Sequence, residues 1–174
     1  MAAALVAEES TKTKPDERSG KYLAFHLGAE EFAIRVLTVR EIMGLQEITV
    51  VPQTPEYLKG VINLRGRVIP VVDLRLRFGM AQVEYTQRTC IIVAQVQGES
   101  DKIPMGIVVD GVSEVLNLAS ADIEDTPDFG VSLPTPFILG MAKIKGKVNI
   151  LLDIDRVLTG QELRSVAAAI PGAV

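Results

Sequence analysis

The sequence has little of the chemistry that catalytic sites use. Its 174 residues include one histidine, His26, one cysteine, Cys90, and no tryptophan. A single histidine excludes His-based catalytic triads and metal sites built from several histidines. No Gly-Lys-Ser/Thr follows a predicted strand, so a phosphate-binding loop is not expected either. We expect His26 to be a surface imidazole and Cys90 to be a structural, buried small hydrophobe. The sequence therefore favours a binding module over an enzyme, with no cofactor and no metal site.

The chain has no excess of positive charge, and aromatic side chains and long apolar runs are scarce. The net charge is −4 and aromatic residues make up 5% of the chain, so neither a basic footprint nor stacking platforms for nucleic acid are expected. No run approaches the roughly 18 apolar residues that cross a membrane, and the first residues lack the basic start of a signal peptide. One cysteine allows no internal disulfide and suits a reducing compartment. These features predict a soluble, cytoplasmic protein without membrane insertion.

The most informative stretch is residues 61–79, in which two apolar, β-branched runs flank Arg65-Gly66-Arg67. Short runs of this kind around a glycine predict a β-hairpin, with Gly66 at the positive φ that a tight turn requires. Asp73 follows the second run and is placed to cap a short helical turn over residues 74–78. The stretch thus predicts hairpin, cap and helical turn in sequence.

Most other predicted elements are strands. Residues 54–60 carry Thr, Pro, Glu and Gly in the order of a complete small helix, and residues 155–169 are typical of a C-terminal helix. Residues 36–43 fit a helical turn leading into a strand, and their state is left open. The predicted strands are residues 21–27, 32–34, 48–51, 88–97, 103–109, 112–118, 137–144 and 147–153.

The chain also repeats itself. Gly60 and Gly66 each have a matching glycine 80 residues later, at Gly140 and Gly146, and LRGRV is matched by IKGKV at the same offset. A second match relates residues 39–43 to residues 112–116. Ordered matches of this kind predict a duplicated unit of short strands, each copy the size of a small barrel.

The expected division of the chain follows from this repeat. Residues 1–20 form a disordered tail, residues 21–160 form the double unit, and residues 161–174 form a C-terminal helix and tail. The first unit is placed at approximately 21–80 and the second at approximately 88–160, with an exchange of strands between them left open.

The sequence GVINLRGRVIPVVDLR, residues 60–75, resembles the signature of the CheW-like domain family of bacterial chemotaxis. The resemblance continues in residues 27–32, 39–42 and 106–112, and runs from about residue 22 to residue 163. It implies an all-β fold with a few short helices: two small five-stranded SH3-like β-barrels packed side by side, with a C-terminal helix.

The resemblance also implies a function. Members of this family are adaptors without catalytic activity that couple transmembrane chemoreceptors to the histidine kinase CheA, in arrays beneath the membrane. The partners implied are the regulatory domain of CheA and the cytoplasmic tips of methyl-accepting chemoreceptors. The resemblance assigns receptor binding to Val39, Glu41, Ile42, Gly60, Arg65 and Val112, with Gly66 and Gly146 as structural turns. Cys90 falls where the family usually has an aliphatic residue, and kinase-contact residues are not assigned.

Two alternatives remain at the level of sequence. The same scaffold could serve another chemosensory-type pathway, one that controls pilus motility or gene expression. A nucleic-acid-binding small barrel is the other, and the net charge of −4 disfavours it. Glu41 and Arg65 are both charged residues among apolar neighbours, and we expect them to lie near each other on one surface.

Overall fold

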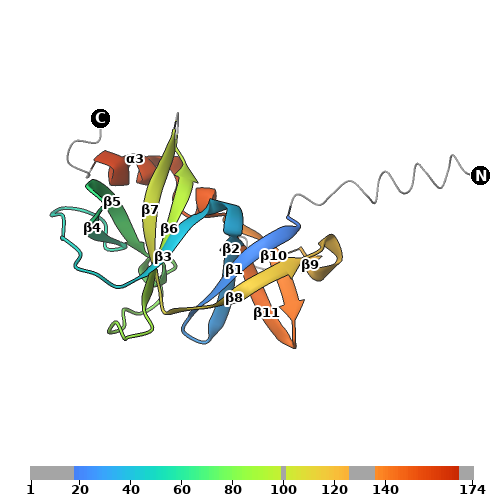
Figure 1. Cartoon of the computed structure of the whole chain (residues 1–174). Coiled ribbons are helices and arrows are strands. Elements are labelled where there is room, and N and C mark those ends of the chain that lie inside the picture. Colours follow the sequence, from blue (N-terminus) through green and yellow to red (C-terminus); the bar gives the residue numbers. More distant parts are fainter. Residues whose placement is uncertain (1–17, 99–100, 126–135, 169–174) are drawn as a thin grey trace, which may run out of the picture.

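The computed structural model describes residues 18–98, 101–125 and 136–168, and contains two β-sheets packed side by side (Figure 1). One sheet has the order β3-β6-β7-β5-β4, and the other has the order β8-β1-β2-β11-β10-β9. The strands of the first sheet are β3 (Val39–Gly44), β4 (Leu58–Leu64), β5 (Arg67–Asp73), β6 (Cys90–Gln97) and β7 (Lys102–Val109). Those of the second are β1 (Gly20–Leu27), β2 (Glu30–Arg35), β8 (Gly111–Leu118), β9 (Ile123–Glu124), β10 (Ile138–Ile144) and β11 (Lys147–Leu152). The first sheet with its hairpins is called the central unit below, and the second is called the terminal unit.

The helices are short and lie at the ends of strands. They are η1 (Val36–Thr38), α2 (Leu74–Arg77), η2 (Ser120–Asp122), η3 (Ile154–Arg156) and α3 (Gly160–Ala168). The carboxylate of Asp73 accepts a hydrogen bond of 2.9 Å from the backbone N–H of Arg75, which is the cap that the sequence predicted for the helical turn.

The two units are not consecutive in the chain as the division at about 80 and 88 supposed. The N-terminal hairpin β1-β2 joins the C-terminal strands, with β2 parallel to β11 and β1 antiparallel to β8. The central unit uses only residues between Val39 and Val109. The hairpin β1-β2 thus lies inside the sheet of the C-terminal strands, where β1 and β2 are each paired on both sides.

The internal repeat extends to the strand pairing. The orders β3-β6-β7-β5-β4 and β8-β1-β2-β11-β10 have the same pattern of antiparallel and parallel neighbours. Val71 pairs in parallel with Gly106, and Leu151, 80 residues after Val71, pairs in parallel with Ala33. The terminal unit has one extra short strand, β9, where the central unit has the single bridge between Thr49 and Val61.

Both hairpins of the repeat turn in the same way. Arg65 and Gly66 have φ of 51° and 84°, and Lys145 and Gly146 have φ of 51° and 78°. Two consecutive positive φ values are the geometry of a type I′ turn, whose twist matches that of the flanking strands. The two turn glycines therefore have the backbone conformation that the sequence required of them.

The core is divided into three clusters, one inside each unit and one shared. The shared cluster contains Phe25 and Phe32 of the terminal unit, Ile92 and Met105 of the central unit, and buried residues after β11 that include Leu158. Strands that contribute to both kinds of cluster are buried on both faces: in β1, Tyr22 and Ala24 lie in the terminal unit's own core, while Leu23, Phe25 and Leu27 lie in the shared one. This is why the strand lacks a simple alternation in sequence.

Asp110 links the two units at the single residue between β7 and β8. Its carboxylate accepts a hydrogen bond of 2.6 Å from the backbone N–H of Gly28 and lies 3.5 Å from Nη1 of Arg75. Gly28 belongs to the β1-β2 turn, and Arg75 belongs to α2 of the central unit. One carboxylate thus connects the turn of one unit to the helix of the other.

Two predicted elements are wrong. Residues 54–57 are loop and turn and residues 58–60 begin strand β4, so no helix forms there, and residues 48–51 keep only the bridge at Thr49. The reason lies at Gly60, whose φ is +146° and where a Cβ would lie 2.1 Å from the carbonyl oxygen of Thr49. The glycine that resembled a helix C-terminus instead allows a bulge in β4 and a close approach of two backbones.

The remaining expectations differ mainly in extent. Residues 36–43 form the 3-10 turn η1 followed by β3, and the predicted C-terminal helix is divided into η3 and α3. Of the expected disordered tail, residues 1–17 lie outside the described residues, and β1 begins at Gly20. No helix in the described ranges is both long and apolar enough to cross a membrane.

Candidate partner-binding site

The candidate site begins on β3, an outer strand of the central unit. The pairing of β3 with β6 shifts between Val39 and Glu41, so Arg40 lies in a β-bulge. The extra residue of a bulge is left unpaired, and the strand bends there. Val39 and Glu41 are half-buried, whereas Arg40 is exposed and Ile42 keeps 45% of its surface accessible.

Glu41 and Arg65 form a two-point ion pair. Nη1 of Arg65 donates to Oε1 of Glu41 at 3.1 Å, and Nη2 donates to Oε2 at 2.8 Å. The Arg65 side chain is 75% exposed and that of Glu41 is 26% exposed. The expected proximity of these two residues is present, and the planar guanidinium is held in a single orientation at the surface.

This ion pair also connects two distant parts of the central unit. β3 and β4 stand at opposite ends of the strand order, and in the described residues no ladder joins them. Glu41 nevertheless reaches the turn between β4 and β5, so a side-chain contact connects the two ends of the strand order. The turn is fixed from its other side by Asn63, whose side-chain oxygen accepts a hydrogen bond of 2.9 Å from the N–H of Gly66.

The electrostatics of the pair keep Arg65 charged. The hydrogen bonds that it donates to Glu41, together with the attraction of the carboxylate, raise the pKa of the Arg65 guanidinium above its ordinary value. The group therefore remains a cation and a hydrogen-bond donor at every pH at which proteins usually fold.

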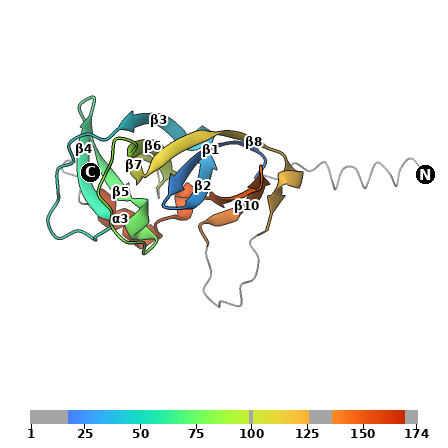
Figure 2. The ribbon, with the colours of Figure 1, turned by 90° about the horizontal axis from the view of Figure 1, so that it is seen from below.

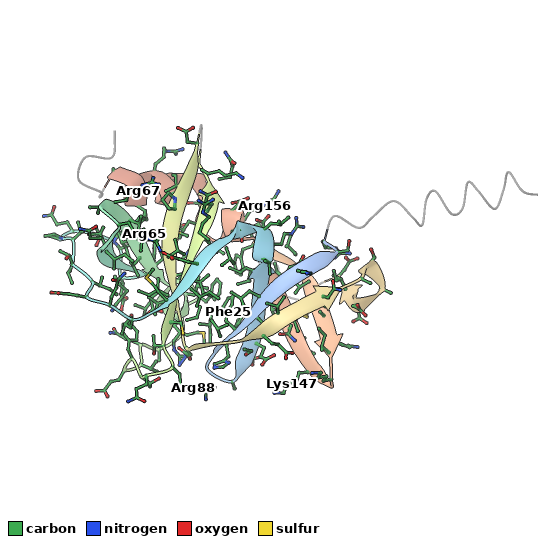
Figure 3. The ribbon with its side chains drawn as sticks, in the orientation of Figure 1. Phe25, Arg65, Arg67, Arg88, Lys147 and Arg156 are labelled. Atoms are coloured by element: carbon green, nitrogen blue, oxygen red, sulfur yellow. The ribbon has the colours of Figure 1, made fainter. Side chains whose placement is uncertain are left out.

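An open depression of about 350 Å³ lies beside the pair. Three arginines line it, and Figure 3 shows Arg65 and Arg67 near each other on the central unit, far from Lys147 of the terminal unit. The lining residues are Arg40, Glu41, Leu64, Arg65, Arg67, Ile69, Val93, Gln95 and Pro104. Reasoning from sequence missed Arg40, Arg67 and Gln95, although an arginine on each side of Gly66 was a visible signal.

The other predicted site residues are arranged around β3 and β8. Val39 and Val112 are half-buried and pack against the shared core from two different units. The outer strands that carry them, β3 and β8, lie on the same side of the molecule in both views (Figures 1 and 2). Gly60 is buried, so it contributes to any surface through the position of Thr49 instead of by direct contact.

The two residues with possible chemistry lie elsewhere. His26 is half-buried instead of fully at the surface, and its Nδ1 is 3.2 Å from Oγ of Ser113. Cys90, expected to be buried, is also half-buried, and its Sγ lies 3.1 Å from the carbonyl oxygen of Arg88. Within the part of the chain that the structure describes, no group of three or more His, Cys, Asp or Glu side chains could hold a metal ion.

Comparison with known proteins gives a consistent answer. The model of the CheW-like domain family matches residues 21–162. The chain is 39% identical to the chemotaxis protein CheW of Klebsiella aerogenes over 146 residues, which cover 84% of this chain and 86% of the relative. It is 40% identical to the chemotaxis protein CheW of Rhizobium meliloti over 140 residues, 80% of this chain and 88% of the relative.

A solved structure is similar in fold as well as in sequence. The scaffolding protein TtCheW from Thermoanaerobacter tengcongensis superimposes with a TM-score of 0.72 at 32% identity. The match covers 83% of this chain and 97% of that one. The two side-by-side β units are therefore the architecture of that scaffold too.

Proposed function

Because the chain belongs to the CheW-like domain family, a family of adaptors without catalytic activity, we propose that it couples transmembrane chemoreceptors to the histidine kinase CheA. Its place would be the cytoplasmic face of a membrane receptor array. The observation that carries the proposal is the two-point pair of Glu41 and Arg65, an oriented guanidinium that is 75% exposed on the matched domain.

The receptor-facing surface in this proposal is built from β3, β8 and the β4-β5 turn. Ile42 offers exposed apolar area, Val39 and Val112 support the strands from beneath, and Arg65 offers the donors that Glu41 leaves unused. Apolar contact together with an oriented arginine is the combination that dominates many protein interfaces. Gly60 and Gly66 act through the backbone that holds this surface.

The test is co-sedimentation of the full chain with membranes that contain chemoreceptors, with and without CheA. The parent chain is expected in the pellet, and the kinase is expected to join it only when the chain is present. Arg65→Ala should lose most receptor binding. Arg65→Lys should lose it too, because an ammonium cannot make both contacts to Glu41.

Lys145→Ala is the matched control, since Lys145 occupies the same turn position in the terminal unit with the same φ of 51°. A parent chain that stays in the supernatant with every receptor tested contradicts the proposal and favours another chemosensory-type pathway. Parent-like binding by Arg65→Lys would remove the argument from the two-point pair.

A further inference from the structure

The depression beside Glu41 carries more positive charge than the ion pair explains. Arg40, Arg65 and Arg67 line it, and Glu41 is the one carboxylate among its lining residues. Glu41 is engaged by Arg65, and in the described residues neither Arg40 nor Arg67 takes part in an ion pair or a hydrogen bond of its side chain. Two exposed guanidinium groups thus have no counter-charge, in a chain whose net charge is −4.

The fold does not require this arrangement. In the terminal unit, Ser113 stands where the repeat places Arg40, and Lys145 and Lys147 stand at the positions of Arg65 and Arg67. The same hairpin and the same strand order form there with a serine and two ammonium groups. The cluster of three arginine guanidinium groups is therefore specific to the surface of the central unit, and the fold does not require it.

The shape of the depression limits what could bind. Four apolar residues line the depression beside the arginines: Leu64 and Pro104 are half-buried, whereas Ile69 and Val93 are buried. Its lining has no aromatic side chain on which a base could stack, and the chain as a whole would repel a polyanion. A carboxylate flanked by apolar side chains matches both the arginines and the apolar residues of the depression, since guanidinium groups bind carboxylates through paired hydrogen bonds.

We propose that Arg40 and Arg67 select an acidic segment of the receptor, whose carboxylates pair with these arginines while apolar neighbours cover Leu64 and Pro104. This rests on the proposed function and adds to it the chemical class of the receptor surface. Arg65 remains paired with Glu41, and Arg40 and Arg67 supply the long-range attraction that brings the acidic segment to it.

The first experiment is a titration of the full chain with a soluble cytoplasmic fragment of a chemoreceptor from the same genome. Arg40→Gln and Arg67→Gln are each expected to weaken binding about two- to fivefold at low salt, the range of exposed charge pairs. The loss should shrink when ionic strength rises from roughly 0.1 M to roughly 0.5 M, because screening removes the attraction in the parent as well.

Lys147→Gln is the matched control, since Lys147 is the exposed cation at the same hairpin position in the terminal unit. It should bind as the parent does at both salt concentrations. Equal losses in Lys147→Gln, or losses that do not depend on salt, would overturn the assignment. A parent that fails to bind the fragment contradicts the proposed function itself. If the parent binds and both arginine variants bind equally tightly, only the proposal of an acidic segment is overturned.

A second experiment identifies the groups that meet. In Arg67→Lys, the new amine can be joined to a neighbouring carboxylate by a carbodiimide, which condenses the two into an amide with loss of water. Mass spectrometry of the complex is expected to find residue 67 linked to an Asp or Glu of the receptor fragment, and Lys147 not linked. Linkage of Lys147 alone would contradict the proposal. So would a result in which a single-stranded oligonucleotide, and not the receptor fragment, blocks the reaction of residue 67.

Discussion

The central and terminal units are two versions of one design within a single chain. In both, an aspartate stands at the end of the second strand of the hairpin or directly after it. Oδ1 of Asp73 accepts from Arg75 N at 2.9 Å, and Oδ1 of Asp153 accepts from Asp155 N at 3.1 Å. Their own N–H groups donate at 2.8 Å to the carbonyls of Tyr57 and Phe137, which are again 80 residues apart. Hairpin, cap and backbone contact are thus what the fold needs in both copies.

The units differ in side chains that the fold does not need. The central unit has the pair of Glu41 and Arg65, whereas within the described ranges no ion pair joins the matching Glu114 and Lys145. Asp73 is 2% exposed and also accepts a hydrogen bond from the Tyr85 hydroxyl at 2.8 Å, whereas Asp153 is more open and faces Arg156. The comparison separates structural residues, which recur, from residues that serve one unit only.

The largest effect is expected from a substitution at Gly60, where the backbones of β4 and the Thr49 segment approach most closely. A Cβ on Gly60 would lie 2.1 Å from the Thr49 carbonyl oxygen at a φ of +146°, whereas one on Gly140 would lie 2.7 Å from the Glu124 carbonyl oxygen. Gly60→Ala should lower the free energy of unfolding by on the order of 3 kcal/mol or more, since clash and strained φ add. Gly140→Ala should cost less. Chemical denaturation of both variants measures the difference, and equal losses would contradict it.

The next comparison concerns the two capping aspartates. Asp73→Ala removes a cap and leaves the hydroxyl of Tyr85 without its acceptor, so a loss of about 2 to 4 kcal/mol is expected. Asp153→Ala removes a cap and a largely exposed ion pair with Arg156, for a loss of about 1 kcal/mol. In the variant Tyr85→Phe/Asp73→Ala the two losses should not add, because the partners share one interaction. Additive losses in urea titrations would show that the hydroxyl is satisfied elsewhere.

The two turns sharpen the comparison in another way. Gly66→Val and Gly146→Val place a β-branched residue at φ of 84° and 78°, so each should cost about 1 to 3 kcal/mol. Stability should therefore fall to a similar degree in both. Receptor binding, measured at a temperature where both variants are folded, should fall only for Gly66→Val, because that turn carries Arg65. Equal binding losses would mean that the two hairpins are not functionally distinct.

The smallest effect is a pH dependence at α3, the helix that follows the terminal unit and meets the central one. Burial alone would raise the pKa of Glu162, but hydrogen bonds from Thr159, the positive charge of Arg77 and a hydrogen bond from Tyr57 lower it below its ordinary value of 4.5. A carboxyl with a lowered pKa stabilises the folded state above its unfolded pKa, and this is lost as pH falls through the folded pKa. The stability of the parent should therefore fall below pH 4.5.

Glu162→Gln tests this with little change in shape. The variant should be less stable than the parent at neutral pH, and the difference should narrow as the pH drops below 4.5. Thermal melts at several pH values measure it. A difference that stays constant across that range would show that the charge of Glu162 does not hold α3.

Local pattern was sufficient for the hairpins, and for the residues that the turns demand. The β-branched runs around Arg65-Gly66 and Lys145-Gly146 lie in antiparallel ladders, and Asp73 caps the helical turn that follows. Local pattern failed at residues 54–60. Thr, Pro and Gly stand there in the order of a small helix, but Gly60 lies at a bulge in β4. A seven-residue segment cannot nucleate a helix against a tertiary contact such as Thr49 with Val61.

The sequence by itself determined the repeat, the strands, the turns and the family to which the chain belongs, because these depend on the identity of neighbouring residues and on their spacing. Only the tertiary structure decided that β1-β2 completes the terminal unit, that Glu41 reaches Arg65 across the open ends of a sheet, and that Arg40 and Arg67 line one depression. Strand partners are chosen by the burial of whole faces and by edges that need hydrogen bonds, and residues far apart in the chain supply both.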